Sequence, residues 1–129
     1  MEPPNQEQTK IVILADDEPY ILAAYKEALE LAGFKVYPVR DGQEVLDNLK
    51  KFVPDLLVLD LIMPGVSGFE VIKALKADDN LNTLPIVVLT NLSQGSDEEE
   101  VKNLGVNEYI IKADTSISEF IERVNQVFI

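Results

Sequence analysis

Polar residues that could do chemistry follow four short apolar runs of this sequence. They are Asp16, Asp17 and Glu18 after the first run, Asp60 after the second, Thr90 at the end of the third and Lys112 at the end of the fourth. Carboxylates that gather at one place repel one another unless a cation lies among them. A hard divalent ion with oxygen ligands relieves this repulsion, and Mg²⁺ prefers one or two carboxylates together with waters and phosphate oxygens. The residue types therefore favour a metal site that handles phosphate.

Phosphoryl transfer is the reaction that this set of side chains suits best. It needs mainly positioning and neutralisation of charge on the phosphoryl oxygens, which a metal, the ammonium of Lys112 and the hydroxyl of Thr90 provide. A carboxylate can act as the nucleophile and form an aspartyl-phosphate. Asp60 is the expected nucleophile because it ends the run predicted to be the central strand, and Asp16 with Asp17 is better placed to hold the metal.

Each of these residues also has an ordinary structural interpretation. An acid after a strand often caps a helix or is solvated in a loop, and a lysine is usually exposed. For each residue considered alone, this structural interpretation is favoured. Their joint occurrence at four predicted strand ends favours a site instead.

Composition narrows the chemistry further. The chain has 129 residues, 23 acids against 11 bases, a net charge of −12, no histidine and no cysteine. The absence of histidine excludes histidine zinc sites and Ser-His-Asp triads, and the absence of cysteine excludes disulfides and thiolate catalysis. An acidic surface repels nucleic acids and anionic membranes, so neither is an expected partner.

The predicted elements alternate strictly between strand and helix. Strands are expected at residues 10–15, 34–39, 55–60, 85–90 and 108–112, and helices at 19–32, 42–52, 67–77, 96–104 and from Ser116 through Val127. Such alternation predicts an α/β fold, a doubly wound five-stranded parallel sheet with helices on both faces. Ligands of such sheets bind outside the carboxyl ends of the strands, where the strand order reverses.

Local signals refine these boundaries. Pro38 argues against an interior position for the second strand. Ser96 with Glu99, and Ser116 with Glu119, have the spacing of capping boxes at two helix starts. Residues 1–9 are polar and resemble neither a signal peptide nor a membrane span, so we expect a loose tail before one domain at 10–129. The chain is expected to be soluble and cytoplasmic.

The sequence resembles the receiver domains of two-component response regulators over roughly residues 10–129. The resemblance is carried by residues 11–19 (IVILADDEP), 57–68 (LVLDLIMPGVSG), 87–90 (VVLT) and 105–112 (GVNEYIIK). The pattern Asp-x-x-Met-Pro-Gly-x-x-Gly is highly specific. The resemblance implies a flavodoxin-like strand order 2-1-3-4-5 and a stand-alone, chemotaxis-regulator-like protein.

The resemblance also implies a role for each site residue. Asp60 would accept a phosphoryl group from the histidine of a sensor kinase or phosphotransfer protein. Asp16, Asp17, Asp60 and the backbone carbonyl of Ile62 would hold Mg²⁺, with Mn²⁺ as a substitute. Thr90 and Lys112 would contact the phosphoryl group, and Thr90 with Tyr109 would form the switch. The output would be altered binding of a downstream protein by the face of helix four, strand five and helix five, and no external substrate would be turned over. Without the family, Tyr109 is more simply a strand aromatic with its hydroxyl in water.

Three positions depart from the family pattern. Ala113 replaces a proline that is often preceded by a cis bond, so we expect a trans peptide and a changed direction for Lys112. Asn91 replaces a small residue and is expected to crowd or hydrogen-bond the phosphoryl position. Ile62 is apolar where some members carry a polar residue, and we expect it to disfavour attack by water and to slow self-dephosphorylation.

Other functions fit the residues less well. A receiver-like interaction module that is never phosphorylated is the first rival, supported by Ala113 and Asn91. A haloacid-dehalogenase-type phosphatase would want a second acid where Ile62 stands. A flavin binder would want a glycine- and hydroxyl-rich loop where the acids Asp16-Asp17-Glu18 stand, and these would repel its phosphate.

Overall fold

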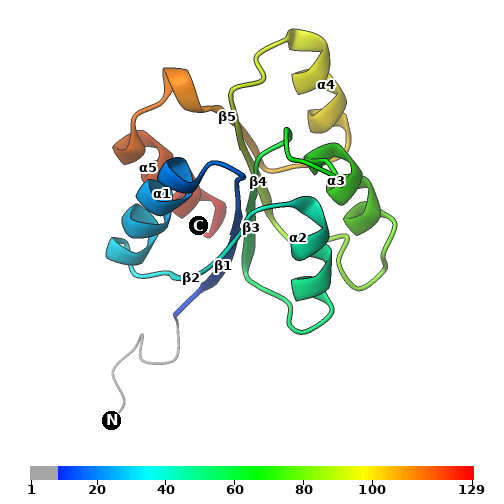
Figure 1. Ribbon diagram of the computed structural model, residues 1–129, viewed down its shortest axis with the longest axis horizontal. Helices are drawn as coiled ribbons and strands as arrows, with labels where there is room; N and C mark the ends of the chain where they lie inside the picture. Colours follow the sequence, from blue (N-terminus) through cyan, green and yellow to red (C-terminus); the bar gives the residue numbers. More distant parts are fainter. Residues whose placement is uncertain (1–8) are drawn as a thin grey trace.

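The computed structural model describes residues 9–129 of the chain, and it contains one five-stranded sheet (Figure 1). The strands are β1 (Ile11–Ala15), β2 (Lys35–Val39), β3 (Leu56–Leu59), β4 (Ile86–Thr90) and β5 (Glu108–Ile111). All pairs are parallel, and the order is β2-β1-β3-β4-β5. The predicted fold class and strand order are confirmed. The tail predicted at 1–9 lies, apart from Thr9, outside the described residues.

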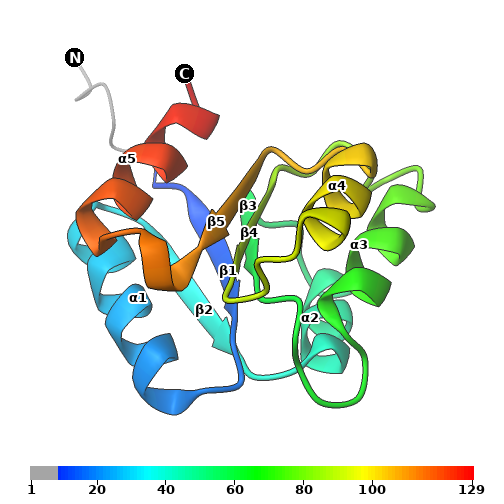
Figure 2. The same cartoon turned by 90° about the horizontal axis from the view of Figure 1, so that it is seen from above.

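The helices cover both faces of the sheet. They are α1 (Pro19–Leu31), α2 (Gly42–Leu49), α3 (Gly68–Lys76), α4 (Gly95–Asn103) and α5 (Ile117–Val127), with a short 3-10 helix η1 (Lys112–Asp114) between β5 and α5. Helices α1 and α5 lie on one face, and α2, α3 and α4 lie on the other (Figure 2). The order reverses between β1 and β3, so the carboxyl ends of these two strands form the predicted binding edge.

Alternating side chains of each strand build two separate cores. Val12 and Leu14 of β1 pack with residues of α1 and α5, whereas Ile13 of the same strand packs with residues of α2, α3 and α4. Every residue of β3 and β4 is buried, because helices cover both of their faces. This explains the uninterrupted apolar runs in the sequence. Pro38 lies in β2, an edge strand, where its missing N–H leaves no ladder bond unmade.

The helix starts agree with the sequence signals in all but one case. Ser116 accepts a hydrogen bond from the Glu119 amide at 3.0 Å, as predicted for α5. The predicted cap at Ser96 is wrong. The cap of helix α4 is Gln94, two residues before Ser96, because the Gln94 carbonyl already accepts bonds from the Asp97 and Glu98 amides at 3.1 and 3.2 Å. Ser96 therefore lies inside the first turn, where it cannot act as the cap.

The longest of the described helices, α1, has 13 residues. Within residues 9–129, no helix combines the length and the apolar character that a bilayer crossing requires.

Candidate functional site

Asp16 and Asp60 are held rigidly at the ends of the two central strands. The Asp16 amide donates to the Val39 carbonyl, and the Asp60 amide donates to the Ala15 carbonyl, each at 3.1 Å. These bonds continue the β-ladder past the last strand residue. Both aspartates are buried, with residue exposures of 2% and 6%, whereas Asp17 is exposed. The sheet therefore fixes two carboxylates next to each other and leaves the third open to solvent.

The three predicted acids form one cluster. One carboxylate oxygen from each of Asp16, Asp17 and Asp60 lies within 4.8 Å of the others. A polar hollow of about 400 Å³ borders the cluster and is lined by Asp17, Arg40, Asp41, Glu44 and Pro64. An all-oxygen donor set beside open space suits a hard divalent cation that keeps several of its waters. Among the described residues, the donor set therefore fits the Mg²⁺ that the sequence predicts.

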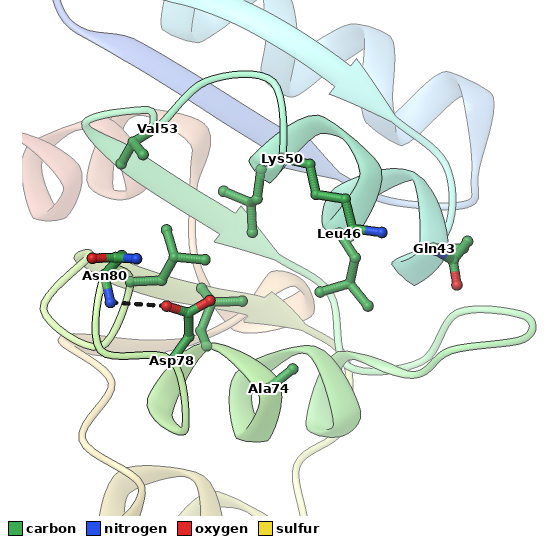
Figure 3. A pocket seen from close by; sticks show the side chains of 10 residues that line it. Gln43, Leu46, Lys50, Val53, Ala74, Asp78 and Asn80 are labelled. Carbon is green, nitrogen blue, oxygen red and sulfur yellow. Dashed lines mark hydrogen bonds between the residues drawn. The ribbon is translucent and has the colours of Figure 1, made fainter.

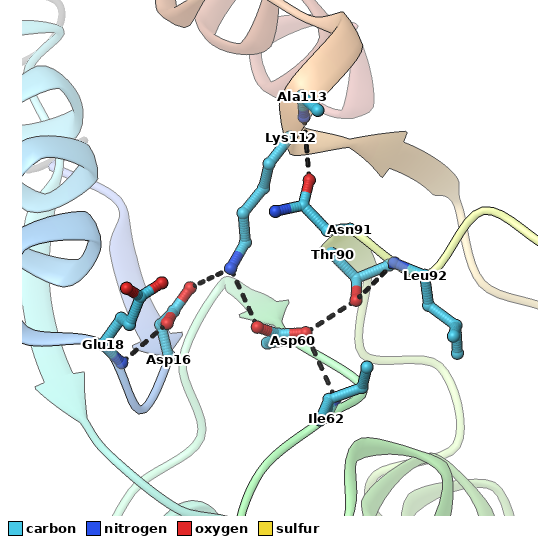
Figure 4. Close-up of polar contacts among 9 residues, drawn as sticks. All are labelled: Asp16, Glu18, Asp60, Ile62, Thr90, Asn91, Leu92, Lys112 and Ala113. Atoms are coloured by element: carbon cyan, nitrogen blue, oxygen red, sulfur yellow. Dashed lines mark hydrogen bonds and ion pairs between the residues drawn. The ribbon is translucent and has the colours of Figure 1, made fainter.

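Lys112 joins two of the acids from across the sheet. Its Nζ donates to Asp16 Oδ2 at 2.5 Å and to Asp60 Oδ2 at 2.8 Å (Figure 4). Burial by itself lowers the pKa of Lys112. The hydrogen bonds and negative charges of the two aspartates outweigh burial, so the pKa lies above its ordinary value. Lys112 is thus a fixed cation at the acid cluster.

The second oxygen of Asp60 is also engaged. Asp60 Oδ1 accepts from Thr90 Oγ1 at 2.7 Å and from the Ile62 amide at 3.2 Å. Thr90 is fully buried, and its hydroxyl oxygen also accepts from the Leu92 amide at 3.3 Å. Asp60 is therefore surrounded by one cationic, one hydroxyl and one amide donor. Such donors could also bind the oxygens of a phosphoryl group attached to this carboxylate.

The loop after Asp60 approaches its backbone very closely. A Cβ on Gly68 would lie 2.3 Å from the Asp60 carbonyl oxygen, so only glycine fits there. The Gly68 amide donates to the Leu61 carbonyl at 2.9 Å, and Ser67 forms a capping box with Glu70 at the start of α3. The glycine that ends the Met-Pro-Gly-x-x-Gly pattern thus lets α3 begin against the strand that carries Asp60.

Tyr109 lies inside the protein, and the interpretation that its hydroxyl is in water is wrong. The ring is buried, with 5% exposure, and the hydroxyl donates to the Leu92 carbonyl at 2.6 Å. Leu92 follows Thr90 by two residues, so the bond connects β5 to the loop that contains the site threonine. Burial, followed by the negative charges of Asp97, Glu98 and Asp60, raises the pKa of Tyr109 to about 12.

This raised pKa predicts a pH-dependent stability. An unfolded chain ionises tyrosine at pH 10.0, but the folded chain keeps Tyr109 protonated up to about 12. Tyr109 therefore contributes to stability fully below pH 10.0, and its contribution is lost as the pH rises through about 12. We expect wild type to lose more unfolding free energy in urea titrations across this window than Tyr109→Phe. Parallel pH profiles of the two proteins would contradict the assignment.

Ala113 does not divert Lys112 from the acids. The Lys112–Ala113 peptide is trans, as expected, and β5 ends at Ile111, so Lys112 opens η1 instead of ending the strand. With this trans peptide, the Lys112 ammonium still reaches both aspartates. The expected change in its direction relative to a family member with a cis proline stays a prediction. Sequence reasoning did not find that Asn91 Oδ1 accepts from the Ala113 amide at 2.9 Å. The sequence does show that Asn91 directly follows Thr90 and that Ala113 directly follows Lys112, which places both residues next to the predicted site.

A larger hollow lies elsewhere and takes no part in the acid site. It has a volume of about 440 Å³ between α2 and α3 and is lined by Gln43, Leu46, Leu49, Lys50, Val53, Ala74, Leu75, Asp78, Asn80 and Leu81 (Figure 3). At its edge, Asp78 Oδ1 accepts from the backbone amide of Asn80 at 2.8 Å. The hollow shares no residue with the acid cluster, so it is separate from the site where the chemistry is expected.

The assembled side chains can support chemistry on a carboxylate. Asp60 is a potential nucleophile, the acids can hold a divalent cation, and Lys112 and Thr90 can bind oxygens that carry negative charge. No histidine or cysteine is present to act as a base or a second nucleophile. The arrangement therefore suits transfer of a phosphoryl group onto Asp60 from a donor that another molecule supplies.

Known proteins share both the sequence and this fold. The model of the response regulator receiver domain matches residues 12–125. The polar-differentiation response regulator DivK of Brucella ovis is 34% identical over 116 residues, which cover 90% of this chain and 94% of DivK. The structure of chemotaxis protein CheY4 of Vibrio cholerae has a TM-score of 0.84 and 26% identity, covering 92% of this chain and 98% of that one.

A phosphorylated relative is also similar. The phosphorylated cyanobacterial phytochrome response regulator RcpA has a TM-score of 0.80 and 30% identity, covering 92% of this chain and 91% of that chain. The match to the family model extends from β1 into α5 and therefore includes all four strand ends that carry the site. Fold, strand order and sequence agree over this span, and the chain belongs to the family of response regulator receiver domains of two-component signalling.

Proposed function

We propose that this receiver domain is a phosphorylation switch whose phosphoacceptor is Asp60. The observation that carries the proposal is the set of donors around this one buried carboxylate, namely Lys112 at 2.8 Å, Thr90 at 2.7 Å and the Ile62 amide at 3.2 Å. The donor would be a phosphohistidine of a sensor kinase or of a histidine phosphotransfer protein. The missing histidine in this chain agrees with a donor on another protein.

The transfer forms one bond and breaks one. A carboxylate oxygen of Asp60 attacks phosphorus, the phosphorus–nitrogen bond of the phosphohistidine breaks, and the imidazole nitrogen leaves with the bonding electrons. Lys112 and Thr90 then bind oxygens of the aspartyl-phosphate. Hydrolysis restores the Asp60 carboxylate, because a water oxygen attacks phosphorus and the bond from phosphorus to the Asp60 oxygen breaks. The electrons of that bond stay on Asp60, and inorganic phosphate leaves. The chain catalyses these steps on itself and turns over no external substrate.

Asp16, Asp17, Asp60 and the backbone carbonyl of Ile62 are the proposed ligands of Mg²⁺, with Mn²⁺ as a substitute. The spacing of the three carboxylates supports this assignment. When bound, the ion would neutralise charge on the phosphoryl oxygens. Two of the proposed ligands are already oriented by the protein, because Asp16 and Asp60 both accept from Lys112. The third carboxylate, Asp17, is exposed to solvent.

Asp17→Asn is expected to remove most of the response of the protein to Mg²⁺. At a Mg²⁺ concentration roughly 100 times the dissociation constant, the ion should stabilise wild type by about 2.7 kcal/mol, because it binds only the folded site. Thermal unfolding with and without chelator measures this. The variant should gain much less, and the exposed Asp79→Asn should behave as wild type. Equal gains for wild type and Asp17→Asn would contradict the proposed ligand set.

Thr90 and Tyr109 are the proposed switch residues. The Tyr109 hydroxyl donates to the Leu92 carbonyl, in the loop that follows Thr90. Movement of this loop toward a phosphoryl group would therefore displace the hydrogen-bond acceptor of Tyr109. The proposed output is altered binding of a downstream protein by the α4–β5–α5 face. The acidic surface agrees with a protein partner and disfavours nucleic acid or a membrane. We expect the domain to act in the cytoplasm together with its phosphodonor.

The function is tested with a small phosphodonor. Incubation with Mg²⁺ and acetyl phosphate should raise the mass of the chain by one phosphoryl group, and a chelator should prevent the gain. The second candidate is an interaction module of the same fold that is never phosphorylated, favoured by Ala113 and Asn91 at two family positions. No gain in mass under these conditions would favour that candidate.

Ile62→Asn is expected to shorten the lifetime of the phosphorylated form by roughly tenfold. Ile62 is 58% exposed and adjoins Asp60 through its amide, so its side chain lies at the rim of the site. An apolar side chain cannot hydrogen-bond an attacking water, whereas an amide can. Loss of phosphoryl mass over time after donor removal measures the lifetime. Ile62→Leu is the control and should keep the wild-type lifetime, and an unchanged or longer lifetime in Ile62→Asn would contradict the role of Ile62.

A further inference from the structure

A side-chain hydrogen bond joins the two loops that carry the phosphoryl-binding residues. Asn91 directly follows Thr90, and Ala113 directly follows Lys112. The Ala113 amide donates to Asn91 Oδ1 at 2.9 Å (Figure 4). The residues are separated by 22 positions in the chain, so the bond is a tertiary contact. It lies beside the bonds that connect Lys112 to the aspartates.

The bond begins where the sheet stops. The last paired residues of β4 and β5 are Thr90 and Ile111, and beyond them the two strands diverge into separate loops. Asn91 then connects to Ala113 by its side chain instead of its backbone. The chain on both sides of Lys112 is thereby held, by the strand pair at Ile111 and by the Asn91 bond at Ala113. The Lys112 carbonyl also accepts from the Thr115 amide at 3.4 Å, but that bond is local to η1. The Asn91 bond is the contact that connects this side of Lys112 to the loop after β4.

The direction of Lys112 depends on this backbone. Its side chain extends from the start of η1 and reaches the acids that directly follow β3 and β1, two and three strands away from β5. A lysine side chain is a flexible four-carbon stem, so the side chain by itself does not determine where its ammonium lies. The position of its Cα therefore decides whether one ammonium can reach both Asp16 and Asp60. We propose that Asn91 is a positioning residue for Lys112, an inference that rests on the proposed function for its effect on phosphoryl transfer.

The same bond orients the Asn91 amide. Since Oδ1 accepts from Ala113, the Asn91 nitrogen is directed toward the side of the site on which Lys112 lies (Figure 4). A direct bond from this nitrogen to the phosphoryl group is therefore the competing explanation of any effect of Asn91. The two explanations differ in whether the Ala113 amide is needed.

The first measurement does not require phosphorylation. Asn91→Leu keeps the approximate size of the side chain and removes the acceptor. We expect faster hydrogen exchange of the Ala113 amide, and faster proton exchange of the Lys112 ammonium, by about fivefold each, the factor for one net hydrogen bond. Asn125→Leu, an exposed substitution on α5, is the control and should leave both unchanged. Unchanged exchange of the Lys112 ammonium in Asn91→Leu would overturn the proposal, whatever the outcome for the proposed function.

The second measurement is a double-mutant cycle on the rate of phosphorylation by acetyl phosphate. Asn91→Leu should slow the reaction of wild type by about fivefold. In the Ala113→Pro background, which lacks the amide proton and carries the usual family residue, Asn91→Leu should have no further effect. Mg²⁺ affinity should stay unchanged by Asn91→Leu. A further fivefold loss in the double variant would show that Asn91 acts without the Ala113 amide and would overturn the proposal. If Ala113→Pro does not fold, the exchange measurement decides.

Discussion

Asp60→Asn is expected to abolish phosphorylation of the chain by acetyl phosphate, with a loss of at least about 10³-fold. The amide keeps the size of the side chain but has no anionic oxygen to attack phosphorus. The hydrogen bonds from Thr90 and the Ile62 amide require only an acceptor, so the fold should persist. Mass spectrometry after incubation with Mg²⁺ and donor measures the effect, and circular dichroism confirms folding.

Asp79→Asn is the matched control for this prediction. Asp79 is an exposed aspartate between Asp78 and Asn80, which line the hollow between α2 and α3, and it is not one of the clustered acids. Its substitution should leave phosphorylation unchanged. A phosphoryl group that still appears on Asp60→Asn would locate the acceptor elsewhere and would contradict the proposed role of the donors around Asp60.

Lys112→Met is expected to have the largest effect on stability and to slow phosphorylation as well. Lys112 donates to both Asp16 and Asp60, and all three side chains are less than one-tenth exposed. Removing the cation leaves the carboxylates buried and unpaired, which costs about 3 kcal/mol. Phosphorylation should slow by roughly 10² to 10³-fold, comparable to the loss of one oxyanion donor. Urea unfolding in chelator and the phosphodonor assay measure the two effects, and Mg²⁺ should restore part of the stability.

Lys26→Met separates this effect from that of an ordinary ion pair. Lys26 pairs with Glu30 at 2.9 Å on the surface of α1, and such a pair contributes at most about 0.5 kcal/mol. The pH dependence gives a second check. Because the folded pKa of Lys112 is raised, its contribution is complete below the ordinary value of 10.5 and is lost as the pH rises above it. Similar losses of unfolding free energy in Lys112→Met and Lys26→Met would contradict the structural role of Lys112.

The fold could be predicted largely from local patterns. The uninterrupted apolar runs predicted β1, β3 and β4 because both faces of a central parallel strand are buried. Pro38 predicted an edge position for β2 because it lacks the N–H that an interior strand needs on both sides. Ser96 predicted the wrong helix start, since its spacing to Glu99 is that of a capping box but the Gln94 carbonyl had already closed the first turn. Capping patterns depend on a backbone path that sequence spacing does not fix.

The site could be predicted as a set of residues but not as a set of contacts. Asp16, Asp60, Thr90 and Lys112 were found because each stands at a strand end. The pairing of Lys112 with two acids was not predicted, nor was the bond from the Tyr109 hydroxyl to the Leu92 carbonyl. These contacts connect elements whose separation in space depends on strand order and on the lengths of side chains.

By itself, the sequence determined which chemistry is available and at which edge of the sheet it lies. Strand ends are local features, and all carboxyl ends of a parallel sheet point the same way. Only the tertiary structure decided which groups meet. Lys112 and Asp16 are 96 residues apart, and they touch because β5 and β1 are ordered in the same sheet. The bond between Asn91 and Ala113 has the same origin, because two loops that have left the β-ladder approach each other only in the folded chain.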